Sequence, residues 1–360
     1  MLISQKIKNA VKPFFKTISI LGVVAVLGIN VLKYNPDLGV FTDALTRASA
    51  SLLFFEKEGS AVATTKKENK KLAADSPSDK TEDLTINANL LIPAENRVSI
   101  QEKQITSSIS NTNFALKSGF LYNTTDLEHD TVSSLLERKL SLKLEKTDLP
   151  QVLLFSTHTT ESYLSFDLGY YDKTAAIRNM SAAFNVLAVG KTIKDELEKS
   201  GVKSIQITEI SDEPYTGAYD RSRALIERVM AEYPSIKVLI DVHRDHIQYS
   251  DGSRGKPTAV IDGKKAAQLM IITGCDNGNM NFPNWRENLD FAVRLQEKTE
   301  EMFPGLTKPI LFDYRKYNMD VTPASLLLEF GSSANTLEEA KYTGTLVARA
   351  LTKLLQECGI

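Results

Sequence analysis

From residue 149 onward, short apolar runs alternate with longer stretches in which apolar residues recur every three or four positions. The short runs are rich in Val, Ile, Leu and Phe, as buried strands are, and the longer stretches have the period of amphipathic helices. This alternation predicts an α/β domain with a mostly parallel, twisted sheet flanked by helices. The predicted strands are 151–156, 203–210, 237–242, 268–274, 309–314 and 325–331, and the predicted helices lie near 181–200, 219–232, 286–303 and 337–356.

Three local signals support these elements. Asp262 and Gly263 form a dipeptide typical of a tight hairpin, which predicts one antiparallel strand pair. Gly201 stands where the first predicted helix needs a glycine beyond its last turn. Thr336 and Glu339 have the spacing of a capping box, which places the start of the last helix after Thr336.

The N-terminal pattern differs, because a run of uncharged, mostly apolar residues follows four lysines. We expect a membrane anchor at 17–33, with 1–16 in the cytoplasm and the rest of the chain exported. A cleaved signal peptide is the alternative, since Ala48-Ser49-Ala50 resembles a cleavage site. That site lies much farther past the apolar run than a signal peptidase site should, which favours the anchor.

Three further segments follow the anchor. Residues 34–83 include a long stretch of mixed charge with no aromatic and few aliphatic side chains, so we expect a flexible linker. Residues 84–148 contain apolar runs without a clear period, and we predict a small juxtadomain region there. The α/β domain is expected over 149–360.

Charge and cysteine content limit the function classes. With 43 Lys and Arg against 45 Asp and Glu, the formal net charge is −2, which gives no reason to expect nucleic-acid binding. Two cysteines, Cys275 and Cys358, are too few for a disulfide framework, although one bridge remains open.

Two histidines and a glutamate lie near the ends of three predicted strands. His158 follows the run VLLFST, His243 ends VLIDVH, and Glu329 lies within SLLLEFG. Because ligands in mostly parallel sheets gather at the carboxyl ends of the strands, we expect all three on one rim. A carboxylate buried without a partner costs several kcal/mol, so Glu329 should have a function. We predict that it is a general base.

Glu161, three residues after His158, could share one metal ion with two imidazoles. A hydrolytic zinc site has three protein ligands and an open position for water, so we predict a zinc site of His158, Glu161 and His243. Simpler interpretations remain open. His246 could replace His243 as a ligand, a neighbouring aspartate could orient His243 without metal, and Glu161 could be a carboxylate at a helix N-terminus.

Several segments resemble the stage II sporulation protein P family of endospore-forming bacteria, over roughly residues 149–355. The anchor and linker also fit this family. The matching segments, in order, are PQVLLFSTHTTESY, AFNVLAVGKTIKDELEKSGV, YPSIKVLIDVHRD, NFPNWRENLDFAVRLQ, YNMDVTPASLLLEFGS and NTLEEAKYTG.

The resemblance implies a domain similar to zinc-dependent N-acetylmuramoyl-L-alanine amidases. These enzymes cut the amide between the lactyl group of N-acetylmuramic acid and the first alanine of the stem peptide, and the family is also credited with endopeptidase cleavage of cross-links. By motif, His158 and His243 correspond to the family's histidines and Glu329 to its terminal-strand glutamate. The third ligand stays open between Glu161 and another residue, because cell-wall amidases take their zinc glutamate from a position well after the first histidine. In the corresponding region this chain has Asn185, which is not a glutamate.

Peptidoglycan offers sugar rings for aromatic stacking and stem-peptide carboxylates for arginine or amide donors. We therefore predict Arg178, Arg244, Trp285 and Asn318 as substrate-binding residues, although Trp285 could equally belong to the core and Arg244 could hold a nearby aspartate.

The resemblance also implies stage II sporulation proteins D and M as partners. It places the protein in the mother-cell membrane, with the catalytic domain facing the septal space during engulfment. Two other functions stay open, a zinc carboxypeptidase-like peptidase acting on stem peptides and a catalytically idle scaffold of the engulfment complex.

Overall fold

The structure, a computed structural model, describes residues 92–359, which belong to one compact unit. The predicted cytoplasmic segment, anchor and linker (1–16, 17–33 and 34–83) lie outside the described residues. Within 92–359, no helix combines the length and the apolar character needed to cross a membrane.

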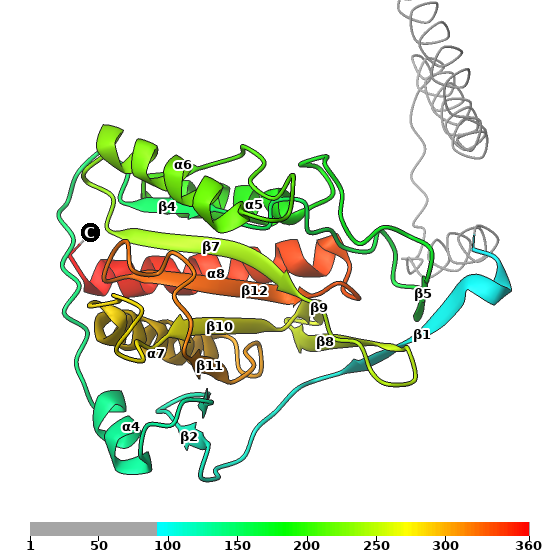
Figure 1. Cartoon of the computed structure of the whole chain (residues 1–360), viewed down its shortest axis with the longest axis horizontal. Helices are drawn as coiled ribbons and strands as arrows, with labels where there is room; N and C mark the ends of the chain where they lie inside the picture. The colour runs from blue at the N-terminus through cyan, green and yellow to red at the C-terminus, as the bar shows by residue number, and fades with distance from the viewer. Residues whose placement is uncertain (1–91, 360) are drawn as a thin grey trace, which may run out of the picture. The chain divides into compact units, whose positions relative to one another are not determined.

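The central element is an eight-stranded sheet in which five of the seven strand pairs are parallel (Figure 1). The predicted mostly parallel sheet is therefore confirmed, and all six strands predicted for it are present. In spatial order the strands are β2 (Asn113–Ala115), β3 (Phe120–Asn123), β11 (Ile310–Asp313), β10 (Leu269–Gly274), β12 (Ser325–Ser332), β7 (Val238–Asp245), β4 (Val152–Phe155) and β6 (Ser204–Gln206).

Helices cover both faces of this sheet. Alternate residues of a strand point to opposite faces, and Leu154 belongs to the larger apolar cluster whereas Leu153 and Phe155 belong to a smaller one. The larger cluster packs under α5 (Val186–Lys199), α7 (Trp285–Met302) and α8 (Leu337–Glu357), and the smaller cluster packs under α6 (Ala218–Glu232). All four predicted helices are confirmed, and α8 begins with the predicted Thr336–Glu339 capping box.

A second sheet has four strands in the order β5 (Tyr170–Asp172), β1 (Arg97–Lys103), β8 (Arg254–Ile261) and β9 (Lys264–Ala267). The predicted hairpin joins β8 to β9 as an antiparallel pair. Asp262 and Gly263 at its turn have φ angles of 49° and 75°, the left-handed conformation that a two-residue hairpin requires.

Residues before 149 are part of both sheets, which differs from the juxtadomain region predicted over 84–148. Strand β1 pairs with β8 in the smaller sheet, β3 pairs with β11 in the larger one, and α4 (His129–Leu136) packs on α7. The three- and four-residue strands β2 and β3 are too short to show a period in the sequence.

Candidate metal centre

The sheet order brings the predicted strand-end residues together. Strands β4, β7 and β12 are neighbours and run parallel, so their carboxyl ends lie on one rim. His158 follows β4, while His243 and Glu329 are direct partners in the pairing of β7 with β12. Paired residues of adjacent parallel strands project to the same face, which places the Glu329 and His243 side chains side by side.

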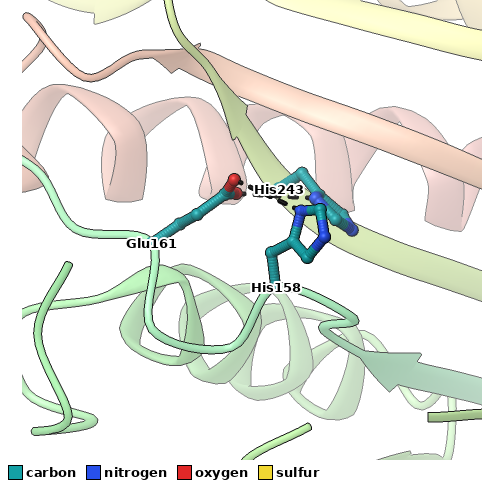
Figure 2. Close-up of side chains that lie close together, drawn as sticks. All are labelled: His158, Glu161 and His243. Carbon is teal, nitrogen blue, oxygen red and sulfur yellow. Dashed lines mark ion pairs between the residues drawn. The ribbon is translucent and has the colours of Figure 1, made fainter. Parts of the chain in front are cut away.

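His158, Glu161 and His243 form a compact cluster (Figure 2). Each offers one ligand atom, and these three atoms lie within 4.8 Å of one another. The Nδ1 atoms of His158 and His243 each lie 3.5 Å from a different carboxylate oxygen of Glu161. Two imidazoles and one carboxylate are a donor set of catalytic zinc sites, so the residues present fit this metal.

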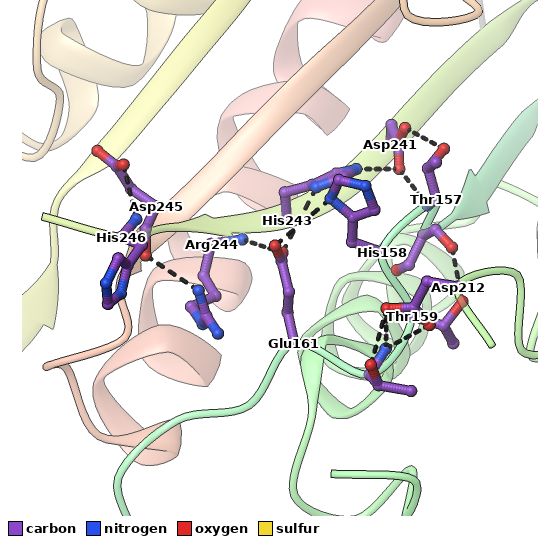
Figure 3. Close-up of polar contacts among 12 residues, drawn as sticks. Thr157, His158, Thr159, Glu161, Asp212, Asp241, His243, Arg244, Asp245 and His246 are labelled. Carbon is purple, nitrogen blue, oxygen red and sulfur yellow. Dashed lines mark hydrogen bonds and ion pairs between the residues drawn. The ribbon is translucent and has the colours of Figure 1, made fainter. Parts of the chain in front are cut away.

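Neighbouring polar groups fix two of these three side chains (Figure 3). The backbone N–H of Arg244 donates a 3.1 Å hydrogen bond to Glu161. Asp241 lies 2.8 Å from Nε2 of His243, although this contact lacks hydrogen-bond alignment. Asp241 in turn accepts hydrogen bonds from the backbone N–H and the hydroxyl of Thr157, at 2.8 and 2.7 Å. A carboxylate behind a histidine ligand is the usual arrangement that fixes its tautomer and orientation.

The proximity of these groups shifts their pKa values. Burial opposes ionisation of Glu161, but hydrogen bonds with His158 and His243 outweigh it and lower the pKa of the carboxyl. Burial likewise opposes charging of His243, but the carboxylates of Asp241 and Glu161 raise its pKa well above the usual value. The pocket therefore keeps Glu161 as a carboxylate, the form in which it can bind a cation.

Glu329 differs from Glu161 in having few partners. It is half-buried, and its Oε2 atom is buried without a hydrogen-bond partner among the described residues. Burial raises the pKa of its carboxyl to about 8, against the opposing charge of His243 and with the help of Glu161. An unpartnered carboxylate oxygen beside a ligand cluster is available to exchange a proton with a reacting group.

Of the predicted substrate-binding residues, Arg178 lies beside the cluster. Its Nη2 atom is 4.0 Å from Glu161, and its Nη1 atom donates to Asp212 and, at 3.2 Å, to Thr160. Asn318 lies nearby, because its side-chain amide donates to the backbone carbonyl of Tyr219, whose ring contacts His158.

Arg244 and Trp285 are buried in the protein, contrary to a role in direct substrate contact. The Arg244 guanidinium donates to the backbone carbonyls of Ser162 and Ile177, at 2.9 and 2.6 Å. Trp285 begins α7 and packs in the core against Phe312, with 6% of its surface exposed. Arg244 therefore positions the segment that carries Glu161, and Trp285 has the core role that was its alternative.

The structure also separates the alternatives for the ligands. His246 lies outside the cluster, where its Nδ1 atom contacts the hydroxyl of Ser333 at 2.8 Å. Asn185 caps α5 by accepting a hydrogen bond from the backbone N–H of Leu187. Among the described residues, Glu161 is thus the carboxylate that joins His158 and His243.

Other residues at the centre were not singled out from the sequence. Tyr215 stacks on His158 with 4.8 Å between ring centroids, and Tyr219 meets the same ring edge-on at 5.6 Å. Asp212 accepts hydrogen bonds from Thr160. These residues precede or begin α6 and belong to no recognisable motif. Only tertiary packing brings them to the centre.

Comparison with known proteins agrees with the family resemblance. The family model for stage II sporulation protein P (SpoIIP) matches residues 48–352. Stage II sporulation protein P of Bacillus subtilis (strain 168) is 30% identical over 244 residues, which make up 64% of this chain and 58% of that protein. The chain thus matches somewhat over half the length of this relative.

Solved structures of amidases overlap the chain weakly. The N-acetylmuramoyl-L-alanine amidase AmiC2 of Nostoc punctiforme is 14% identical, with a TM-score of 0.34, over 59% of this chain and 99% of that one. The CwlD amidase from Clostridioides difficile, in complex with the GerS lipoprotein, is 11% identical, with a TM-score of 0.35, over 58% and 98%. At these TM-scores the overlaps add nothing to a functional assignment.

Proposed function

Because this chain belongs to the stage II sporulation protein P family, we propose that it is a zinc-dependent N-acetylmuramoyl-L-alanine amidase that degrades peptidoglycan during sporulation. The observation that carries this proposal is the cluster of His158, Glu161 and His243, with the partly unpartnered carboxylate of Glu329 on the next strand. A ligand set of two histidines and one carboxylate beside a free carboxylate is the minimum equipment of a zinc hydrolase.

His158, Glu161 and His243 would hold the zinc ion. When bound, zinc supplies a Lewis acid for the scissile carbonyl and lowers the pKa of a water molecule to about 7. Asp241 and the backbone N–H of Arg244 keep His243 and Glu161 in the orientation that binding requires.

Glu329 performs the proton transfers in this proposal. Its carboxylate accepts a proton from the attacking water and then delivers that proton to the stem-peptide nitrogen as the amide bond breaks. The products are a lactyl carboxylate on the glycan and a stem peptide with a free alanine amine. A side chain that accepts and then donates a proton needs an oxygen without a permanent partner, as Oε2 of Glu329 has.

The proposal extends to location and partners. A membrane anchor at 17–33 would hold the domain outside the cytoplasm, at the mother-cell membrane, where peptidoglycan is removed during engulfment. Stage II sporulation proteins D and M are the proposed partners, and endopeptidase cleavage of cross-links is a proposed second activity.

Digestion of purified peptidoglycan with the zinc-loaded full chain, followed by mass spectrometry of the products, tests the activity. We expect stem peptides that begin at alanine, and we expect Glu329→Gln to lower the rate by about 10²–10⁴-fold at unchanged zinc content. The matched control is Glu338→Gln, since Glu338 is an exposed glutamate of α8 paired only with Lys341 among the described residues.

Other results of this digestion would contradict the proposal in different ways. Release of terminal stem-peptide residues alone would indicate a carboxypeptidase-like enzyme. Absence of any cleavage by the zinc-loaded chain, together with intact function of Glu329→Gln in sporulating cells, would indicate a scaffold. Equal rates for the wild type and Glu329→Gln would rule out Glu329 as the base.

A further inference from the structure

Three tyrosines form a continuous aromatic group beside His158, which we call the tyrosine rim. Tyr215 and Tyr219 contact the His158 ring directly, and Tyr317 stacks on Tyr219 with 5.0 Å between centroids and 14° between planes. The three residues come from the segment before α6, the first turn of α6, and the loop between β11 and β12. The mechanism proposed above uses none of them.

The loop that carries Tyr317 is held in an unusual backbone conformation. Tyr317 and Asn318 have φ angles of 41° and 57°, in the left-handed region that non-glycine residues rarely adopt. Side-chain contacts fix this turn, because Asn318 donates to the Tyr219 carbonyl at 3.1 Å and Arg315 donates to the Tyr317 hydroxyl at 2.9 Å. A strained turn that presents a ring next to a reactive centre suggests a functional requirement for that ring.

Tyr215 is the exposed part of the rim. Although it stacks on His158, 57% of its surface is exposed, an uncommon state for a large aromatic side chain next to buried polar groups. The guanidinium of Arg178 lies 4.8 Å from the centre of the same ring and is fixed in place by Asp212. The Tyr215 ring and the partly exposed guanidinium of Arg178 therefore lie side by side. The ring contacts the candidate zinc ligand His158.

We infer that the tyrosine rim and Arg178 form a subsite for the pyranose ring of N-acetylmuramic acid. The C–H face of a pyranose packs on aromatic rings, while its hydroxyl and N-acetyl oxygens accept hydrogen bonds from planar donors such as a guanidinium. Stem peptides consist mainly of small and charged residues and offer no comparable apolar face. The sugar is joined through its lactyl group to the scissile amide, so its subsite must adjoin the metal centre, as the rim does.

This inference rests on the proposed amidase activity, and two substrates separate the two hypotheses. One is N-acetylmuramoyl stem peptide, and the other is the same peptide acylated with lactic acid, which keeps the scissile amide but lacks the sugar. We expect the wild-type full chain with zinc to prefer the first. We expect Tyr215→Ala to lower kcat/KM for the sugar-containing substrate by about three- to tenfold more than kcat/KM for the lactoyl peptide.

Two further variants guard against indirect effects on the metal centre. Tyr215→Phe keeps the ring and should retain most of the preference for the sugar. Tyr122→Ala removes a tyrosine of similar exposure from β3 and should behave as wild type. Zinc content is measured for every variant.

The possible results lead to different conclusions. Equal loss on both substrates would mean that Tyr215 acts only through His158, and an unchanged preference would mean that the sugar binds elsewhere. Either result overturns the subsite. If the wild type cleaves neither substrate, the amidase proposal fails and the subsite fails with it.

Discussion

His243 shows how single residues have separate contacts at the candidate metal centre. Its Nδ1 atom faces Glu161 at 3.5 Å and its Nε2 atom faces Asp241 at 2.8 Å. One ring nitrogen thus faces the carboxylate of the other candidate ligand, while a second carboxylate lies beside the opposite nitrogen. Asp241 has 1% of its surface exposed and accepts a hydrogen bond from the Thr157 hydroxyl, so contacts within the protein hold its carboxylate in place.

This arrangement predicts the effect of replacing Asp241. The variant Asp241→Asn should keep its contacts with Thr157 but lose the charge behind His243, and zinc affinity should fall by about 10–100-fold. Competition with a chromophoric chelator measures the affinity. Asp195→Asn, at an exposed aspartate of α5 that pairs with Lys191, is the control. An unchanged zinc affinity in Asp241→Asn would show that Asp241 has only a structural role.

At the scale of elements, a buried lysine joins the small sheet to α8. Lys256 of β8 has a fully buried side chain and lies 2.8 Å from Glu339 of α8 and 2.8 Å from Asp167, in the loop before β5. Glu339 also closes the capping box at the start of α8. Removing one partner of a buried ion pair leaves an uncompensated charge, so this cluster should contribute strongly to stability.

Lys256→Met should lower the free energy of unfolding at pH 7 by about 3–5 kcal/mol. Burial opposes ionisation of Asp167, but hydrogen bonds from Lys256 and Lys265 lower its pKa. A lowered folded-state pKa gives stability that is present above the unfolded value of about 3.9 and is lost as pH falls through the folded value. The difference between wild type and variant should therefore shrink below about pH 4.

Urea denaturation at pH 7 and pH 3.5 measures this difference. Lys341→Met removes an exposed pair with Glu338 and should change stability by less than about 0.5 kcal/mol. A difference between wild type and Lys256→Met that stayed constant with pH would contradict the role given to Asp167.

At the scale of the whole molecule, the order of the strands in the main sheet determines which residues meet at the candidate site. His158 and His243 are far apart in the sequence, and Glu329 lies farther still. The order β12-β7-β4 makes their strands adjacent and parallel. Because the cluster joins segments from different parts of the chain, binding of a metal to the native state should stabilise the entire described fold.

Addition of zinc to metal-free full chain should raise the melting temperature. The expected gain is about 4 kcal/mol when free zinc exceeds the dissociation constant 1,000-fold. Removal of the metal with a chelator should reverse the shift, and His158→Ala should abolish most of it. Calorimetry at several zinc concentrations measures the effect. A melting temperature independent of zinc in the wild type would exclude the cluster as a zinc site.

Much of the fold and part of the candidate site could be predicted from the sequence, because the signals for them are local. Alternating periods predicted six strands of the main sheet and four helices, and the Asp262-Gly263 turn and the Thr336–Glu339 capping box each depend on a few adjacent residues. Strand-end positions likewise indicated His158, His243 and Glu329 as neighbours. Strands β2 and β3 gave no such signal, because strands of three and four residues are too short to show a period.

The sequence by itself determined most elements of the main sheet and its four helices, the family, and the residue types available for chemistry, since these follow from local periodicity and motif. Only the tertiary structure decided which side chains meet. It placed Glu161 between the two histidines, buried Trp285 in the core, and brought Tyr215 against His158. Those outcomes depend on packing between segments far apart in the chain, and no local pattern of polar and apolar residues specifies such contacts.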